Sequence, residues 1–191
     1  MEIFPRIQLV FLGGWMLLVC SWLITLIPLT LLPKSVVSRL FDRSTFTRKQ
    51  KIHTIISKLL GLIVLILCFF SPLIFGWELI LGLTLFGIGT IGLIIAILNF
   101  KNTPLDTPVM RGLYRISRHP QEVMIFIYIL GIVIAIGSGI ALIILLISRI
   151  FFHYRILAEE EACIKKYGDS YLKYKKRVPR YFLRIQISEI G

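Results

Sequence analysis

Long apolar stretches separated by basic loops are the feature that most constrains this chain. The sequence has 191 residues, of which 57% are hydrophobic, and its mean hydropathy is +0.84. No soluble domain of this size needs so much apolar surface, so the sequence predicts an all-α integral membrane protein. Residues 7–32, 52–74 and 77–100 are each long enough to cross the ~30 Å hydrocarbon core of a bilayer as a helix.

The fourth apolar stretch, residues 121–157, predicts two helices rather than one. A single helix of this length would be about 55 Å long, far more than a bilayer needs. Residues 137–139, which read Gly-Ser-Gly, lie near its middle, where a tight turn forms most easily. Basic segments flank both ends, and basic segments stay in the cytoplasm, so an even number of crossings is required. We therefore expect about five transmembrane helices, of which the last two form a helical hairpin.

The distribution of charge also predicts the orientation. The net charge is +12, and the basic connector 34–51 and the basic loop 101–121 should both face the cytoplasm. The uncharged turn at 75–76 and the N-terminus would then lie outside. The amphipathic tail, residues 158–191, would be cytoplasmic and would lie on the headgroup layer. The basic loops and the tail are expected to meet anionic lipid headgroups rather than nucleic acid.

The loop 101–121 carries the candidate chemistry. From Arg111 to Gln121 it reads Arg-Gly-Leu-Tyr-Arg-Ile-Ser-Arg-His-Pro-Gln. Bringing this much charge to the edge of a membrane is costly unless the charges meet something anionic. Pro120 disfavours helix at the two residues before it, which predicts a defined bend at the start of the next apolar stretch. A loop that only orients the chain in the membrane is the alternative interpretation.

A hairpin would bring this loop next to the start of the tail. The polar side chains that would meet there are Tyr114, Arg118, His119, Arg155, Glu159, Glu160 and Tyr171. Arg155 and Glu159 are four residues apart, hence on one face of a helix, where they can pair or jointly face a ligand. A ligand with an amino-acid group would suit such a site, because its carboxylate needs cations and its ammonium needs carboxylates.

The motifs, taken in order, resemble the isoprenylcysteine carboxyl methyltransferase and phospholipid methyltransferase group. They are Gly112-Leu-Tyr-Arg-Ile-Ser-Arg-His-Pro120, a helical hairpin, Arg155-x-x-x-Glu159-Glu160, and Tyr167-Gly-Asp-Ser-Tyr-Leu-Lys-Tyr-Lys-Lys-Arg-Val-Pro179. The resemblance covers residues 99–182. It implies a catalytic part at 101–191 that follows three N-terminal transmembrane helices at 1–100, and it implies S-adenosylmethionine as the cofactor.

The resemblance also implies roles for individual residues. The residues implied for cofactor binding are Val109, Tyr114, His119, Pro120, Gln121 and Glu159, and we expect Glu122 and Tyr171 to join them. The candidate catalytic residues are Arg155, which would face the substrate, with Arg118 and Glu160. Glu160 or Glu122 would act as base if the acceptor must lose a proton. The acceptor is expected to be lipophilic and to enter from the bilayer: an isoprenylcysteine carboxylate, or a small lipid, amine or thiol. No metal is expected.

Two residues depart from the family pattern His-Pro-x-Tyr-x-Gly: Glu122 replaces the tyrosine and Met124 the glycine. Either change is expected to alter the acceptor or to disable binding. Two alternatives stay open. One is a NADPH-dependent membrane reductase related to sterol reductases, whose C-terminal part resembles this group, and the other is a non-catalytic membrane scaffold that retains the fold, which these two departures support. The segment 87–92, Gly-x-Gly-x-x-Gly, lies within an apolar span and follows no strand, so we expect close helix packing there rather than phosphate binding.

Overall fold

The described residues of the chain fold into helices and connecting loops. The structure, a computed structural model, describes residues 3, 11–30, 32–41 and 46–182. Its elements are α1 (Gly14–Thr30), α2 (Lys34–Phe41), α3 (Arg48–Phe69), α4 (Trp77–Lys101), the 3-10 turn η1 (Gly112–Arg115), α5 (Pro120–Ala135), α6 (Gly139–Tyr167) and α7 (Asp169–Arg177). Within these ranges the β-structure amounts to an isolated bridge between Gly13 and Pro72. The predicted all-α class is therefore confirmed.

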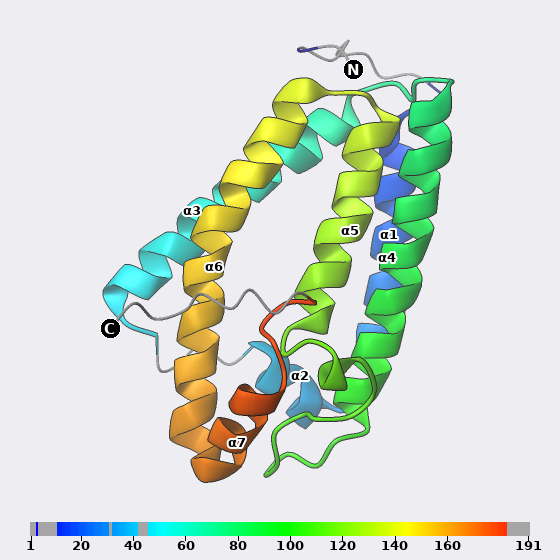
Figure 1. The fold of residues 1–191 in the computed structure, drawn as a ribbon. Coiled ribbons are helices and arrows are strands. Elements are labelled where there is room, and N and C mark those ends of the chain that lie inside the picture. Colours follow the sequence, from blue (N-terminus) through cyan, green and yellow to red (C-terminus); the bar gives the residue numbers. More distant parts are fainter. Residues whose placement is uncertain (1–2, 4–10, 31, 42–45, 183–191) are drawn as a thin grey trace.

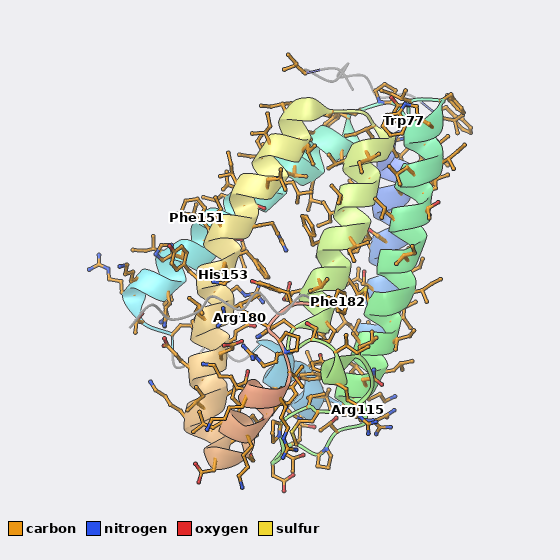
Figure 2. All side chains as sticks on the ribbon, in the orientation of Figure 1. Trp77, Arg115, Phe151, His153, Arg180 and Phe182 are labelled. Carbon is orange, nitrogen blue, oxygen red and sulfur yellow. The ribbon has the colours of Figure 1, made fainter. Side chains whose placement is uncertain are left out.

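The helices are arranged between two ends of different character. Figure 1 shows α1, α3, α4, α5 and α6 running between these ends, with α2, α7 and the loop before α5 gathered at one of them. Figure 2 places Trp77 at one end and Arg115 at the other. Large apolar side chains such as Ile80 and Ile91 are 72% and 62% exposed on the outer faces. Such an apolar exterior is what a multi-pass membrane protein presents to lipid.

Three helices meet the requirements for a membrane crossing. By length and composition, α3, α4 and α6 are long and apolar enough, whereas the apolar helices Gly14–Leu26 and Pro120–Ala135 are shorter. At 1.5 Å per residue, α5 is about 24 Å long. Part of the expected first span, residues 7–10, lies outside the described residues. The number of five crossings therefore stays a prediction.

The predicted hairpin is present. A short turn joins α5 to α6, and in it Gly137 has a φ of +60°, a left-handed conformation that suits glycine. Ser138 begins α6 as its N-cap, because its Oγ accepts a hydrogen bond from the Ala141 amide. The helix then continues past the expected boundary at 157 and ends at Tyr167. The first ten residues of the expected tail therefore continue α6, because no helix-breaking residue occurs before Gly168.

Close packing of α4 against α5 depends on glycine. A Cβ on Gly89 would lie 2.5 Å from the Tyr128 amide nitrogen, and one on Gly92 would lie 2.3 Å from the Met124 sulfur. The expected packing role of the glycines is confirmed for these two, whereas a Cβ on Gly87 would meet nothing within 4 Å. Met124 is buried in this helix interface. Its side chain occupies the space that Gly92 leaves open, so this departure from the family pattern affects helix packing rather than the cavity described below.

The described part of the basic connector 34–51 is largely helical. It contains α2 and the first turn of α3, which begins four residues before the expected start of the span. A capping box starts α3: the Gln50 amide donates to the Thr47 hydroxyl, and the Thr47 amide donates to the Gln50 side chain. Such a cap satisfies backbone groups that would otherwise lack partners at the beginning of a helix.

Candidate functional site

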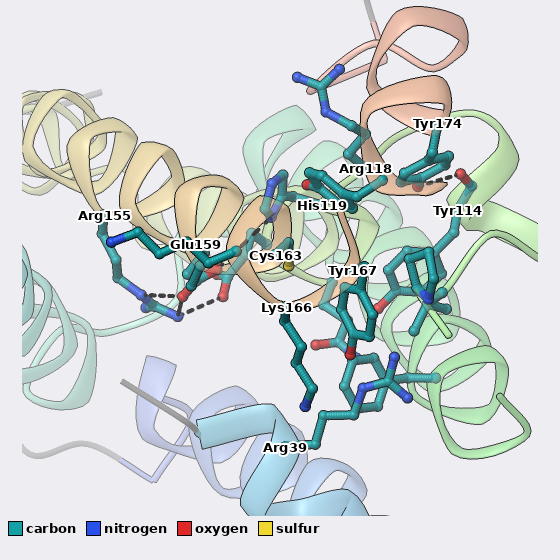
Figure 3. A pocket seen from close by; sticks show the side chains of 18 residues that line it. Arg39, Tyr114, Arg118, His119, Arg155, Glu159, Cys163, Lys166, Tyr167 and Tyr174 are labelled. Carbon is teal, nitrogen blue, oxygen red and sulfur yellow. Dashed lines mark hydrogen bonds and ion pairs between the residues drawn. The ribbon is translucent and has the colours of Figure 1, made fainter. Parts of the chain in front are cut away.

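A cavity of about 480 Å³ lies at the end of the molecule where α2, α7 and the loop before α5 meet. Cavities of ~300–1,000 Å³ are typical of small-molecule and cofactor sites. Its polar and aromatic lining comes from α2, from the end of α4, from the loop, and from α5, α6 and α7. Figure 3 shows these side chains converging from helices that are far apart in the sequence. The cavity is therefore assembled only when the hairpin brings the loop and the tail together.

The loop before α5 is shaped by a glycine and a proline. Gly112 has a φ of +55°, and a Cβ there would lie 2.2 Å from the Asn99 side chain. This close approach lets η1 turn and bury Tyr114, which is 6% exposed, against the cavity. Pro120 is the first residue of α5, as its fixed φ favours, so the predicted bend before it is confirmed.

A line of alternating charge crosses one side of the cavity. The Arg155 Nη2 atom lies 2.8 Å from the Glu159 Oε1 atom and 3.1 Å from the Glu122 Oε1 atom. Arg155 also donates from Nε to Glu159 at 2.9 Å, so the predicted pairing four residues apart is confirmed. The pairing with Glu122 was not predicted. One guanidinium is thus shared by two carboxyl groups.

A second charged cluster lies behind the cavity wall and is centred on Glu160, which is 2% exposed. Its Oε1 atom accepts from Arg118 at 2.7 and 2.9 Å, and each of its oxygens accepts from Arg180 at 3.0 Å. Hydrogen bonding to Glu160 raises the pKa of Arg180. Glu160 is absent from the cavity lining, unlike Arg118. Because both carboxylate oxygens are occupied by guanidinium groups, the geometry disfavours the expected role of Glu160 as a base.

Arg118 also fastens the tail to the loop. Its guanidinium donates to the carbonyl oxygens of Lys175 at 2.9 Å and of Val178 at 2.6 Å, and its backbone amide donates to the Pro179 carbonyl at 3.0 Å. One side chain therefore binds both a carboxylate on α6 and the backbone at the C-terminal end of α7. Charge-assisted hydrogen bonds of this kind are among the strong ones in proteins.

The tyrosines of the tail point inward. Tyr171 and Tyr174 are 4% and 5% exposed and line the cavity, and the Tyr174 hydroxyl donates to the Tyr114 carbonyl at 2.7 Å. Burial raises the pKa of both tail phenols and of Tyr114 well above their usual value, so all three stay neutral at physiological pH. The tail therefore presents its tyrosines to the cavity rather than to the headgroup layer, while Lys173 on its opposite side is exposed.

Two further residues of the loop and α5 face the cavity with polar atoms. The Nε2 atom of Gln121 is buried and has no hydrogen-bond partner among the residues that the structure describes. His119 lies between two acids, with its Nδ1 atom 3.9 Å from Glu159 and its Nε2 atom 3.4 Å from Glu160. A buried amide without a partner carries an energetic cost unless a ligand accepts its hydrogen bond.

The cavity brings together nearly all of the predicted site residues. Those that line it are Val109, Tyr114, Arg118, His119, Gln121, Glu122, Arg155, Glu159 and Tyr171. Pro120 and Glu160 do not line it. Pro120 begins α5, and Glu160 forms an ion pair with Arg118, which does line the cavity.

The sequence analysis missed several lining residues. These are Arg39, Phe100, Pro108, Ala162, Cys163, Lys165, Lys166, Tyr167 and Tyr174. Arg39 was assigned to the basic connector, but it donates to the carbonyls of Pro104 at 2.9 Å and Thr107 at 2.6 Å and lies over the Phe100 ring. No spacing in the sequence links α2 to this loop. The helical spacing of the tail tyrosines could have identified Tyr174.

Comparisons with known proteins point to one family. Residues 77–170 match the family described as phospholipid methyltransferase. The protein-S-isoprenylcysteine O-methyltransferase of Schizosaccharomyces pombe is 39% identical over 72 residues, which make up 37% of this chain and 30% of that relative. No solved structure matches the chain. The matched residues include most of the cavity lining, and neither match favours the reductase alternative. Through residues 77–170, the chain therefore belongs to the phospholipid methyltransferase family of membrane methyltransferases.

Proposed function

We propose that this protein transfers a methyl group from S-adenosylmethionine to a lipophilic acceptor. The observation that carries the proposal is the cavity itself, which lies largely within the family-matched residues and combines paired carboxylates, cations and aromatic rings. The acceptor classes are an isoprenylcysteine carboxylate and a small lipid, amine or thiol. The name of the fission yeast relative supports the first of these.

The residues present fit such a cofactor in charge and in size. A sulfonium and an ammonium are cations, and the group formed by Glu122, Arg155 and Glu159 offers two carboxyl groups beside the cavity. A carboxylate needs donors, which Lys166 and the partnerless Gln121 amide can supply. The aromatic rings in the lining, including those of Tyr114 and Phe100, offer faces for an adenine ring. The volume of about 480 Å³ is sufficient for a molecule of this size.

The cofactor would supply an activated methyl group on a sulfonium. The protein's own residues would contribute position and the exclusion of water, which are the main requirements of an in-line displacement. Buried Tyr114, Tyr171 and Tyr174 close the side of the cavity formed by η1 and α7. Glu160 would act as a positioning residue, because it holds the loop through Arg118 and the tail through Arg180.

The proposed orientation places the cavity at the cytoplasmic face. The basic loop and α7 lie at the same end of the molecule (Figure 1), and basic segments are retained in the cytoplasm. The exposed cations at this end, among them Arg115, Lys173 and Arg177, would then face anionic lipid headgroups. The acceptor would approach from the bilayer, since the cavity lies where the apolar helices meet this polar end.

Calorimetric titration tests the cofactor directly. The detergent-purified protein is expected to bind S-adenosylhomocysteine and to show no binding of NADPH at the same concentrations. Binding of NADPH alone would favour a reductase. A folded sample that binds neither compound would leave the scaffold alternative and would refute the proposed function.

Removal of groups that line the cavity should weaken this binding. Gln121→Ala, His119→Ala and Glu159→Ala are each expected to reduce the affinity for S-adenosylhomocysteine by about 1–3 kcal/mol, because each removes a polar partner from a buried ligand. The matched control is Arg115→Ala, which removes an exposed cation from the same loop and should leave the affinity unchanged. Equal affinities in all four variants would show that the ligand binds elsewhere.

A further inference from the structure

Arg149 is a cation within the apolar helix α6, between Ser148 and Ile150. It lies outside the cavity lining and has no role in the proposed chemistry so far. An ionisable side chain inside a membrane span is costly to maintain and usually marks a functional site. Its surroundings therefore indicate what it can bind.

Aromatic rings surround the guanidinium of Arg149. Its Cζ atom lies 4.3 Å from the centre of the Phe152 ring and 5.4 Å from that of Phe126. In the part of the chain that the structure describes, its Nε atom is buried and has no hydrogen-bond partner. Ring faces attract a cation but accept hydrogen bonds poorly. The guanidinium therefore retains donors that an anion could accept.

The acid that acts most strongly on Arg149 is already engaged. Glu122 exerts the largest attraction on Arg149, but its carboxylate pairs with Arg155 at 3.1 Å. The sign of the side-chain charge thus alternates along the series Glu159, Arg155, Glu122 and Arg149. Among the described residues, Arg149 forms no ion pair of its own, whereas Arg155 forms ion pairs with two carboxyl groups. Arg149 is therefore the better candidate of the two to receive an anionic ligand.

Arg149 lies close to the cavity on its membrane side. The guanidinium groups of Arg149 and Arg155 both contact the ring of Phe152, at 4.3 and 4.7 Å from its centre, and Arg155 lines the cavity. Arg149 is nearer to the hairpin turn along α6. From this turn α5 and α6 diverge (Figure 1), since α5 packs along α4 and α6 packs along α3. Figure 2 shows the segment with Arg180 and Phe182 rising between them from the polar end.

We propose that Arg149 binds the carboxylate of an acceptor that carries an apolar chain. This inference rests on the proposed methyl transfer and specifies its acceptor. A carboxylate can accept two parallel hydrogen bonds from a guanidinium, whereas an amine in its ammonium form would be repelled.

The charge change in the reaction fits this role. A carboxylate oxygen forms a bond to the methyl carbon, the carbon–sulfur bond breaks, and its electron pair passes to sulfur, so the sulfonium becomes a neutral thioether. No proton is released and no base is required. The resulting methyl ester has lost the charge that Arg149 recognises. Arg149 therefore binds the acceptor more tightly than the product and favours product release.

The test uses dodecanoate, methyl dodecanoate and dodecylamine as probes with the detergent-purified full chain. The wild type is expected to bind dodecanoate at least about tenfold more tightly than the other two. Arg149→Gln should lose about tenfold in dodecanoate affinity, and Arg149→Lys, which keeps the charge, should retain part of it. Arg177→Gln, which removes an exposed arginine of α7, is the control and should bind like the wild type. Carboxyl-labelled dodecanoate would show a shifted ¹³C resonance only when it is bound beside Arg149.

Each outcome decides the proposal. Equal dodecanoate affinity in the wild type and Arg149→Gln would overturn it, as would equal binding of the acid and its methyl ester. Displacement of dodecanoate by an equal concentration of phosphatidylglycerol would assign Arg149 to a lipid phosphate and also overturn it. S-adenosylhomocysteine affinity, measured on the same samples, should be unchanged in Arg149→Gln. A wild type that does not bind S-adenosylhomocysteine would refute the methyl transfer, independently of the dodecanoate result.

Discussion

Replacing Glu160 with alanine is expected to detach the tail from the loop and to destabilise the protein by about 3–5 kcal/mol. Glu160 is 2% exposed, and its carboxylate accepts hydrogen bonds from Arg118, whose side chain is 6% exposed, and from Arg180. Without it, Arg118 becomes a buried cation with no acid beside it, and the loss of one partner of a buried ion pair typically costs this much. The expected measurements are a lower melting temperature in detergent and faster proteolysis after Tyr167.

The neighbouring acid provides the control for this change. Glu161 is exposed, and its carboxylate accepts one hydrogen bond from Gln50 on α3. Glu161→Ala should therefore cost no more than about 1 kcal/mol, as exposed polar contacts usually do. A Glu160→Ala variant that is as stable and as protease-resistant as Glu161→Ala would contradict the structural role of the cluster. S-adenosylhomocysteine affinity should fall with Glu160→Ala, because Arg118, Tyr171 and Tyr174 lose their fixed positions in the cavity wall.

Gly131→Val is expected to have the second large effect, because it separates α4 from α5. A Cβ on Gly131 would lie 2.5 Å from both the Gly82 carbonyl oxygen and the Phe86 amide nitrogen. These are backbone atoms of α4 and cannot rotate away, so the two helices must move apart. Overpacking usually costs about 1–3 kcal/mol and occasionally more, and we expect this variant to lie at or above the upper limit. The measurement is the melting temperature in detergent.

Gly87→Val is the matched control for this prediction. Gly87 lies on α4 near Gly82, but a Cβ there would meet nothing within 4 Å, so the melting temperature should stay close to that of the wild type. A similar loss in both variants would indicate that valine disfavours these helices through its propensity rather than through a clash. Because α5 carries Gln121 and Glu122, Gly131→Val should also lower the affinity for S-adenosylhomocysteine, whereas Gly87→Val should not.

The sequence contained enough local information to predict the hairpin and half of the cavity lining. Residues 137–139 predicted the turn because glycine adopts the conformation that the turn needs, and Pro120 predicted the bend before α5. The i, i+4 spacing of Arg155 and Glu159 predicted their ion pair. Each of these inferences depends on residues that are neighbours in the chain or on one helix face, where geometry follows directly from the sequence.

The features that were missed depend on contacts between distant segments. Arg39 joins the cavity because α2 packs against the loop before α5, and its donors bond to backbone carbonyls, which have no signature in the sequence. Met124 was expected to affect the ligand, but it fills the space beside Gly92, more than 30 residues earlier in the chain. Glu160 was indistinguishable from Glu159 by type and position. Only the packing of the tail shows that one carboxylate lines the cavity and the other holds two arginines.

The closure of the cavity by α7 has a consequence for biosynthesis. In the part of the chain that the structure describes, the apolar helices are all complete by Tyr167, before Tyr171, Tyr174 and Arg180 are reached. The segments that membrane insertion needs are therefore separate in the sequence from the residues that close this side of the cavity. A premature stop codon after Tyr167 would yield a chain that the insertion machinery accepts but that lacks one wall of its cavity. Such a product would escape quality control that senses only apolar segments, and it would occupy the membrane without activity.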